Sequence, residues 1–449
     1  MLIQPLTPRP VLGPTFQDII GLKQEVEALK TFVEILRDSA RYEALGASLP
    51  KGLILHGPPG TGKTLIARAL QTETQLPFYP LDAGDVLYQD DENITFKRLV
   101  DVFKKAAEAA PSVIFIDEIE TFLGLNDYGP GDLTTLNHLL KLMDGFYPSD
   151  KVIVLAATND LSKLPYSLLR PGRFDKHIAL TYPNAEAIEH AVRTYAKAFK
   201  FAPNLSMKRI TDVFANLTIA EIKHLMNDVL IDLIQSHQKT IEERHIIDAI
   251  DNYHLGLHQN DIPRHDDLTK RIAYHEAAHA VLHATFGTLD TIARISIVAH
   301  ANSQGHVRIL EDAHRDDTQQ ALENQMTTLL AGYAAEQHFF DETSAGCRQD
   351  LKRATQIATK MVRYYGMNDL NIPRFFRSGD RFMPQPLSAD LEAMLDDNIN
   401  RLLKDALERA RHLVALEEKT ITRVAHALIE RKVLVLDEFK ALLDDNVTQ

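Results

Sequence analysis

The sequence predicts an α/β module built on a parallel sheet, then a helical lid, and then a mainly α-helical domain. Short, continuous apolar runs alternate with amphipathic segments from about residue 50 to residue 182. This alternation is typical of a parallel sheet that helices cover on both faces. Residues 185–256 instead predict helices only, and residues 268–445 predict mostly helices.

Five apolar runs are the expected strands of the sheet. Before these runs, residues 1–13 are Pro-rich and are expected to be extended. The apolar residues of the segment that follows, "DIIGLKQEVEALKTFVEILRD", recur at the spacing of a helix. The segment "YPNAE", residues 182–186, marks the end of the module. The expected strands are "GLILHG", "PFYPLD", "SVIFID", "KVIVLAAT" and "KHIALTYP".

Sequence patterns also predict single elements in the rest of the chain and its division into domains. Thr218 and Glu221 have the spacing of a capping box, which predicts the start of a helix in the lid. The alternating runs "ARISIVAH" and "HVRIL", separated by "ANSQG", predict one β-hairpin. The expected divisions are an extended segment 1–13, an α/β subdomain 14–183, a helical lid 184–258 and a helical domain 259–449.

Composition limits the class of protein. The 449 residues suffice for about three domains, and the net charge of −13 argues against a nucleic-acid-binding surface. The single cysteine, Cys347, cannot form an internal disulfide and suits a reducing compartment. No run approaches the ~18 apolar residues of a membrane helix, and no signal peptide is evident. We therefore expect a soluble, cytoplasmic protein.

"GPPGTGKT", residues 57–64, lies between an apolar run and a helical segment. Its glycines allow a tight loop whose N–H groups point at phosphate oxygens. Lys63 supplies positive charge at the outer phosphates, and Thr64 offers a hydroxyl to Mg²⁺. The sequence therefore predicts an ATP site. Its expected residues here are Gly57, Pro58, Pro59, Gly60, Thr61, Gly62, Lys63, Thr64 and Leu65.

Polar residues at the ends of later strands suit ATP hydrolysis. Asp117 can orient a water on Mg²⁺, and Glu118 can polarise the attacking water. Two adjacent carboxylates could also simply begin a solvated loop. Asn159 is placed to hold the attacking water. Arg170 and Arg173 are either surface ion pairs or arginine fingers that reach a neighbouring subunit's ATP, which requires a ring.

"RIAYHEAAHAV", residues 271–281, has the pattern of a zinc-binding helix. His275 and His279 fall on one helix face about one turn, ~5.4 Å, apart and can reach a single Zn²⁺. Glu276 can take a proton from the attacking water. His283 is excluded as a third ligand, because His275 and His283 are separated by ~12 Å of helix rise. The bare motif also arises by chance, so a third ligand is needed.

The motifs closely resemble the AAA+ ATPase module of the FtsH family of ATP-dependent zinc metalloproteases. The resemblance extends from about residue 14 to residue 445 and includes the segment "TSAGCRQDLKRATQIATKMVRYYG". It implies that Asp350 completes the zinc site, although Asp350 could also be an ordinary helix N-cap. Glu336, the other candidate ligand, is expected to orient a ligand histidine. The motifs of the module are "DIIGLKQEVEALK", "GPPGTGKTLIARAL", "FIDEIE", "LNHLLKLMDGF", "AATND" and "LLRPGRFD".

The resemblance also implies partners and further site residues. Ile20 and Gly21 match the segment that lies against adenine, and Ala220 at the lid helix is expected to contact ATP. Residues 143–146, "MDGF", match the segment that reports nucleotide state to the next subunit. The implied cofactors are Zn²⁺, ATP and Mg²⁺, and the implied partners are unfolded or damaged polypeptides and further copies in a ring, expected to be a hexamer.

The sequence departs from the family pattern in three places. Family members usually carry amino-terminal membrane segments, whereas this sequence starts almost at the ATPase module, so we expect either a soluble variant or an incomplete chain. In the pore loop, Tyr88 is followed by Gln89, Asp90 and Asp91 without the usual glycine, so Tyr88 could grip a substrate in an acidic pore. Ile219 stands where the family usually has a glycine near adenine.

The predicted function is ATP-dependent unfolding of proteins followed by cleavage at a zinc site, with Glu276 and Glu118 as catalytic residues. One alternative is an AAA+ unfoldase or remodelling ATPase whose inactive peptidase domain serves binding or assembly. A second alternative is a zinc peptidase whose ATPase serves only assembly.

Overall fold

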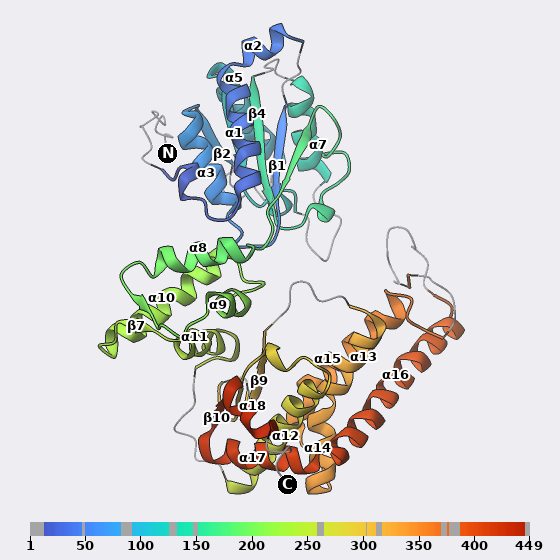
Figure 1. The fold of residues 1–449 in the computed structure, drawn as a ribbon. Coiled ribbons are helices and arrows are strands. Elements are labelled where there is room, and N and C mark those ends of the chain that lie inside the picture. The colour runs from blue at the N-terminus through green and yellow to red at the C-terminus, as the bar shows by residue number, and fades with distance from the viewer. Residues whose placement is uncertain are drawn as a thin grey trace. The chain divides into compact units, whose positions relative to one another are not determined.

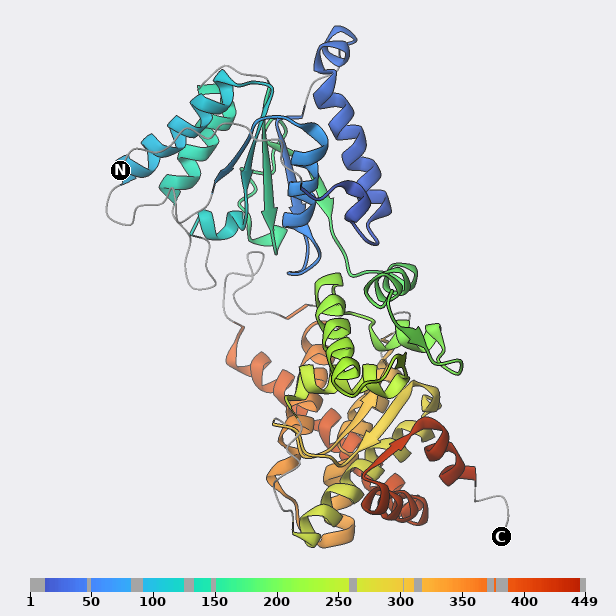
Figure 2. The ribbon, with the colours of Figure 1, turned by 90° about the vertical axis from the view of Figure 1, so that its left-hand side faces the viewer.

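The computed structural model describes most of the chain, in two compact units, Met1–Glu242 and Glu243–Gln449. We describe each unit by itself (Figures 1 and 2). The predicted pore residue Tyr88 and residues 1–12 of the predicted extended segment lie outside the described residues. The structure describes residues 13–46, 50–81, 92–124, 133–146, 151–257, 265–301, 303–310, 317–369, 375–376 and 387–444.

A five-stranded parallel sheet forms the centre of the first unit, with strand order β2-β3-β4-β1-β5. Each of the five predicted apolar runs forms one of its strands, so the predicted α/β fold class is confirmed. The strands are β1 (Gly52–His56), β2 (Phe78–Leu81), β3 (Ser112–Ile116), β4 (Val152–Thr158) and β5 (Phe174–Ala179).

Helices cover both faces of this sheet, which explains why its central strands β1, β3 and β4 are almost continuously apolar. Leu53 and Leu55 of β1 pack into the core on one face, and Ile54 packs into the core on the other. Figure 2 shows the helices on the two sides. The first face is covered by η1 (Phe16–Asp18), α1 (Lys23–Arg37) and α3 (Lys63–Thr74), and the second by α5 (Glu92–Glu108), α6 (Ile119–Phe122) and α7 (Leu133–Lys141). The remaining short helices are α2 (Ser39–Ala44), η2 (Leu142–Phe146) and η3 (Leu161–Lys163).

The rest of the first unit is mainly helical, with α8 (Ala185–Tyr195), α9 (Met207–Val213) and α10 (Ile219–Gln235). The predicted capping box begins α10: the Thr218 N–H donates to the Glu221 carboxylate at 2.8 Å, and the Glu221 N–H donates back to the Thr218 hydroxyl. The prediction of helices alone in this region was wrong in one detail, because two short strands pair in parallel. A strand of two residues is too short to show an alternation of apolar and polar residues in the sequence. They are β6 (Lys200–Phe201) and β7 (Thr240–Ile241).

The second unit is mainly helical, as predicted. Its central helix, α12 (Asp266–Thr285), is buried on all sides from Ile272 to Ala278. Most residues of this enclosed stretch are apolar or small, and the exceptions are the buried His275 and Glu276. The other helices are α11 (Glu243–Leu255), η4 (Leu289–Thr291), α13 (Gln319–Leu329), α14 (Ala331–Phe340), η5 (Ala345–Cys347), α15 (Arg348–Arg363), α16 (Ala389–Leu416), α17 (Glu418–Arg431) and α18 (Leu436–Asp444).

A small sheet accompanies these helices. The predicted hairpin is present, because β8 (Ile292–Ser296) pairs antiparallel with β9 (His306–Ile309). A third strand, β10 (Val433–Val435), pairs with β8 on its other side and was not predicted. Its three residues lie between two helices, where they give no alternating pattern.

A buried ion cluster joins α11 to the hairpin. Asp251 on α11 has no exposed surface. It accepts hydrogen bonds from His306 Nε2 at 3.0 Å and Arg308 Nε at 2.8 Å, and it forms an ion pair with Arg294 of β8. Burial raises the pKa of Asp251, but the hydrogen bond from His306 and the positive charges nearby outweigh burial, so the pKa lies well below its ordinary value.

Asp251→Asn should lower the free energy of unfolding of this unit by about 3 kcal/mol at pH 7, because it removes the buried carboxylate that pairs with the partly buried Arg308 and with the buried Arg294, which keeps Asp248 as a partner. The native pKa of Asp251 is depressed, so its stabilisation is present above the ordinary pKa of an aspartate and is lost as the pH falls below it. The loss of stability on acidification should therefore be shallower in Asp251→Asn than in the wild type. Calorimetry from pH 7 to pH 3, with metal removed from both proteins, measures this. Equal slopes would contradict the prediction.

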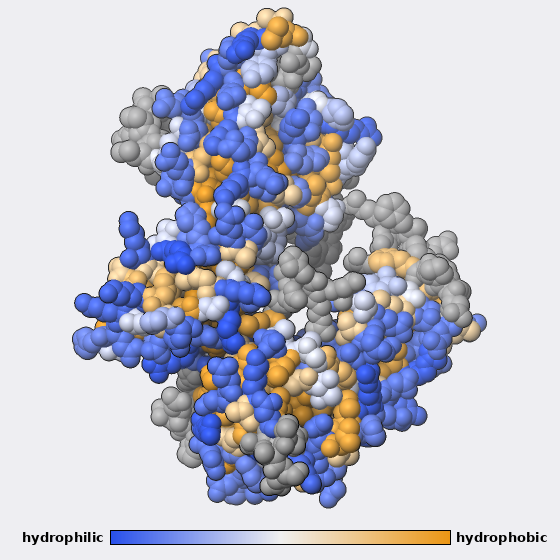
Figure 3. Space-filling view, in the orientation of Figure 1, coloured by the Kyte–Doolittle hydropathy of each residue, from blue (hydrophilic) through white to orange (hydrophobic). Residues whose placement is uncertain are grey.

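Hydrophilic residues cover much of the surface that faces the viewer in Figure 3. The helix α16 is the longest in the described part of the chain, but charged residues recur along it. None of the helices in the described ranges combines the length and the apolar character that crossing a bilayer requires.

Candidate functional site

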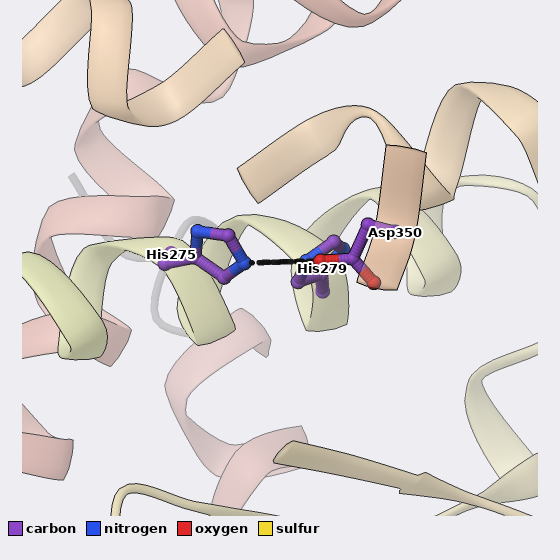
Figure 4. A group of neighbouring side chains, drawn as sticks. All are labelled: His275, His279 and Asp350. Atoms are coloured by element: carbon purple, nitrogen blue, oxygen red, sulfur yellow. Dashed lines mark hydrogen bonds and ion pairs between the residues drawn. The ribbon is translucent and has the colours of Figure 1, made fainter. Parts of the chain in front are cut away.

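Two histidines of α12 point their rings at one another in the second unit (Figure 4). His275 and His279 lie four residues apart, and their Nε2 atoms are 3.0 Å from each other. The His275 side chain is 10% exposed and the His279 side chain 12% exposed. The spacing along the helix therefore produces the convergence that the sequence motif predicts.

Asp350 completes this group from a different helix. It lies in the first turn of α15, and its Oδ2 atom is 3.4 Å from His275 Nε2 and 3.5 Å from His279 Nε2. In a tetrahedral zinc site with ligand bonds of ~2.1 Å, two ligand atoms lie about 3.4 Å apart. The three atoms thus have the separations that a single bound metal ion requires.

The hydrogen-bond partners of the two Nδ1 atoms determine which nitrogen of each imidazole carries the proton. His279 Nδ1 lies 2.7 Å from the carbonyl oxygen of Thr328, which can only accept a hydrogen bond. His275 Nδ1 lies 2.9 Å from the Glu336 carboxylate, so it also acts as a donor. In the neutral rings, both Nε2 lone pairs then face each other and the Asp350 carboxylate. Three converging lone pairs need a positive charge between them, so the donor set fits a cation.

The pKa values of His275 and Asp350 also indicate that this group of side chains favours a positive charge. Burial lowers the pKa of His275, but hydrogen bonds with Asp350, Cys347 and Glu336 outweigh it, and the pKa lies well above its usual range. Burial raises the pKa of Asp350, but the nearby His279 and His275 hold it well below its ordinary value. A proton on His275 therefore supplies charge that a metal ion would replace, so metal binding should release a proton.

Glu336 lies behind His275 rather than among the converging atoms. This α14 residue is 2% exposed, and it accepts hydrogen bonds from the Ser344 N–H at 2.6 Å and the Ser344 hydroxyl at 3.0 Å. Burial raises the pKa of Glu336, but the hydrogen bonds from His275 and Ser344 lower it to about 2. An ionised Glu336 keeps the proton of His275 on Nδ1 and leaves Nε2 free for a metal. Its orienting role stays a prediction, which this position favours.

Glu276 is buried beside the two histidines and is 7% exposed. Burial raises its pKa, while His275, His279 and His306 oppose that shift. The backbone at Gly305, just before β9, lies directly against it: a Cβ atom there would be 2.9 Å from Glu276 Oε1. This contact restricts where the Glu276 carboxylate can lie.

Several residues that support the site were not predicted from the sequence. Gly332 of α14 lies against the His275 ring, since a Cβ atom there would be 2.3 Å from Cε1 of that ring. Thr328, Ser344 and Gly305 act through the contacts given above. They lie on segments far from α12 in the sequence, and nothing in their spacing indicates that they meet it.

In the first unit, the predicted phosphate-binding loop connects β1 to α3. Gly60 and Gly62 have φ values of +81° and +99°, which side chains rarely tolerate. The Lys63 ammonium donates to the carbonyls of Gly57 and Pro58 at 2.7 and 2.9 Å, so it lies within the loop. Burial lowers the pKa of Lys63, and the charges of Glu120, Asp117 and Glu118 oppose this.

The carboxylates predicted at the end of β3 lie beside this loop. The Thr64 hydroxyl donates to Asp117 Oδ2 at 2.8 Å, so the two expected Mg²⁺-binding residues are in contact. Glu118 is exposed and has a positive φ of +47°, and it begins α6. The Asn159 N–H donates to Glu120 Oε1 at 2.9 Å, which ties the end of β4 to the same edge of the sheet.

The other predicted ATP contacts come from outside the loop. A Cβ atom at Gly60 would lie 2.7 Å from the Thr218 hydroxyl, which places the start of α10, and with it Ala220, near the loop. Gly21, next to Ile20, lies against Ala187 at the start of α8.

The two predicted arginine fingers differ in their surroundings. Arg173 forms two hydrogen bonds to the Asp144 carboxylate in its own chain, at 2.8 and 2.7 Å. This favours the ion-pair alternative for Arg173. Arg170 is exposed and lies over the ring of Tyr166, with its Cζ atom 5.5 Å from the ring centroid.

Together the two sites define a class of protein: an α/β nucleotide-binding module followed by a helical domain with a metallopeptidase site. The model of the ATPase family associated with various cellular activities (AAA) matches residues 53–182. The model of peptidase family M41 matches residues 265–442.

Curated relatives identify the family. The chain is 33% identical over 428 residues to the ATP-dependent zinc metalloprotease FtsH of Aster yellows witches'-broom phytoplasma, covering 94% of this chain and 62% of the relative. It is 33% identical to FtsH 4 of Sphaerobacter thermophilus, with 96% and 67% covered, and 31% identical to FtsH of Caldicellulosiruptor bescii, with 96% and 72% covered. The chain therefore spans 62–72% of the length of these relatives. The chain belongs to the FtsH family of ATP-dependent zinc metalloproteases.

Proposed function

We propose that this chain uses ATP hydrolysis to unfold proteins and cleaves them at a zinc site formed by His275, His279 and Asp350. The observation that carries the proposal is the convergence of three lone pairs in the second unit, at separations that suit one metal ion. This convergence argues against an inactive peptidase domain, because a domain kept only for assembly has no need of it.

In the peptidase site, the residues of the chain have separate roles in the reaction. Zinc, when bound, supplies positive charge that polarises water and the scissile carbonyl. Glu276 then takes a proton from the attacking water and passes it to the departing amine. Glu336 and Thr328 hold the two imidazoles in the tautomer that binds metal.

In the ATPase site, the loop N–H groups and Lys63 bind the phosphates, with the Lys63 ammonium exchanging its carbonyl partners for phosphate oxygens. Thr64 and Asp117 are the residues that would hold Mg²⁺. Glu118 polarises the attacking water, and Asn159 orients it. Arg170, and Arg173 if its bond to Asp144 opens, would reach the ATP of a neighbouring subunit.

The two sites serve one reaction because a folded substrate hides its peptide bonds. Opening a domain costs about 5–15 kcal/mol, which a zinc site cannot supply and repeated ATP hydrolysis can. We expect the working form to be a ring, a hexamer, that acts on unfolded or damaged proteins. Tyr88 as the residue that grips substrate, the cytoplasmic location and the division at residues 13, 183 and 258 stay predictions.

Glu118→Gln tests the proposal. It should stop ATP hydrolysis and degradation of a stably folded reporter, while a short unstructured peptide is still cut. A matched control is Glu108→Gln at the end of α5, which should leave both activities intact. If Glu118→Gln degrades the folded reporter at the wild-type rate, the ATPase serves only assembly.

Glu336→Gln should weaken zinc binding about 10- to 100-fold, because an amide no longer supplies the charge that keeps the proton on His275 Nδ1. Titration with a chelator of known affinity measures the change. Glu418→Gln, an exposed residue on α17, is the control and should bind zinc like the wild type. Equal zinc affinity in Glu336→Gln and the wild type would show that Glu336 does not orient the ligand.

A further inference from the structure

The strand β9 is the edge of its sheet in the described part of the chain, paired to β8 alone. An edge strand is held from one side by backbone hydrogen bonds, so side chains must fix the position of its ends. The first residue of β9 is His306, which pairs with Ser296 of β8. Gly305, the residue before it, touches the catalytic carboxylate of Glu276.

The contact between Gly305 and α12 is close. A Cβ atom at Gly305 would lie 2.7 Å from Ile272 Cγ2, 2.9 Å from Glu276 Oε1 and 3.0 Å from Glu276 Cγ. The Gly305 backbone therefore leaves no room for a side chain between itself and these two residues. A small shift of this backbone would change the space in which the Glu276 carboxylate can lie.

The carboxylate of Asp251, on α11, binds side chains at this end of β9. It receives the His306 Nε2 hydrogen bond at 3.0 Å and the Arg308 Nε hydrogen bond at 2.8 Å, so it binds two residues of β9 that point to the same side. It is also paired to Arg294 of β8. One buried carboxylate thus fastens both strands of the hairpin to α11.

We propose that His306, held by Asp251, is a positioning residue for the peptidase reaction: it fixes Gly305 against Glu276 and so aims the catalytic carboxylate. This inference rests on the proposed peptidase function and adds to it a residue that lies outside the zinc-binding motif. His306 does not touch the zinc ligands in any contact described above. Its positioning effect is exerted through the backbone of Gly305, apart from its influence on the pKa of Glu276 described above.

The bond to Asp251, rather than the imidazole itself, carries the effect. Glutamine can place its amide N–H₂ close to the position of His306 Nε2 and keep the bond, whereas alanine cannot. A displacement of about 1 Å at a reacting group can lower a rate about 100-fold. We expect a smaller effect here, since β8 still pairs with β9.

The experiment compares zinc-loaded wild type, His306→Ala, His306→Gln and the control Asp248→Asn on a short unstructured peptide. Asp248 pairs with Arg294 at the outer side of the same cluster. We expect His306→Ala to lower kcat about tenfold with KM and zinc content unchanged. His306→Gln and Asp248→Asn should stay within about twofold of the wild type. Gly305→Ala, which pushes on Glu276 directly, should also lower kcat without loss of zinc.

Amide hydrogen exchange supplies a readout that does not depend on activity. Residues 303–310 should exchange faster in His306→Ala than in the wild type, and at the wild-type rate in His306→Gln. Wild-type kcat in His306→Ala, equal loss of kcat in His306→Gln, or unchanged exchange in His306→Ala would each overturn the inference. A wild-type protein that never cuts the peptide contradicts the proposed function instead, and the exchange rates then decide whether His306 holds the strand.

Discussion

Glu276→Gln should lower proteolysis by about 10²–10⁴-fold, because glutamine cannot take a proton from the attacking water. The amide has nearly the same shape as the carboxylate, so the packing against Gly305 and the positions of His275 and His279 should persist. Zinc content and ATP hydrolysis should therefore stay at wild-type levels. Cleavage of an unstructured peptide, metal analysis and phosphate release measure the three properties.

The control for this substitution is Glu418→Gln, the same chemical change at an exposed residue of α17. It should cut the peptide like the wild type. Persistent cleavage by pure Glu276→Gln protein would remove Glu276 from its role as the base. Loss of zinc together with activity would mean instead that Glu276 helps to build the metal site.

Lys63→Ala should lower ATP hydrolysis at least about a hundredfold, because it removes the one side-chain cation that lies inside the described phosphate loop. Nucleotide affinity should fall as well, since the positive charge at the outer phosphates is lost. Degradation of a folded reporter should stop, while cleavage of a short peptide continues. Phosphate release and the two cleavage assays separate these effects.

The control here is Lys104→Ala, an exposed lysine on α5. It should hydrolyse ATP at the wild-type rate. Unchanged turnover in Lys63→Ala would contradict the assignment of residues 57–64 as the phosphate loop. Loss of peptide cleavage in Lys63→Ala would mean that the peptidase site needs nucleotide for its assembly.

Much of the fold follows from local patterns in the sequence. The central strands β1, β3 and β4 of the large sheet are buried on both faces, so each appears as a short apolar run between helical segments. The hairpin β8–β9 was predicted from the alternating runs on either side of "ANSQG". The strands β6, β7 and β10 have only two or three residues, and pairing with a distant segment alone defines them.

Local sequence patterns likewise predict one part of the candidate site and not the other. His275, Glu276 and His279 lie within one helix, so their convergence follows from the period of the helix. The resemblance to the FtsH family pointed to Asp350, and the structure brings Asp350 to the two histidines. Asp251 could not be foreseen in its present role, because its partners lie on strands more than 40 residues further along the chain.

The most direct test of the account is the degradation of a stably folded reporter by the purified protein under four conditions, with and without ATP and with and without a zinc chelator. The account predicts degradation only when ATP is present and the chelator is absent, with full recovery when zinc is added back. An unstructured peptide should need zinc alone. Degradation of the folded reporter without ATP, or undiminished cleavage after zinc has been removed, would contradict the coupling of the two sites.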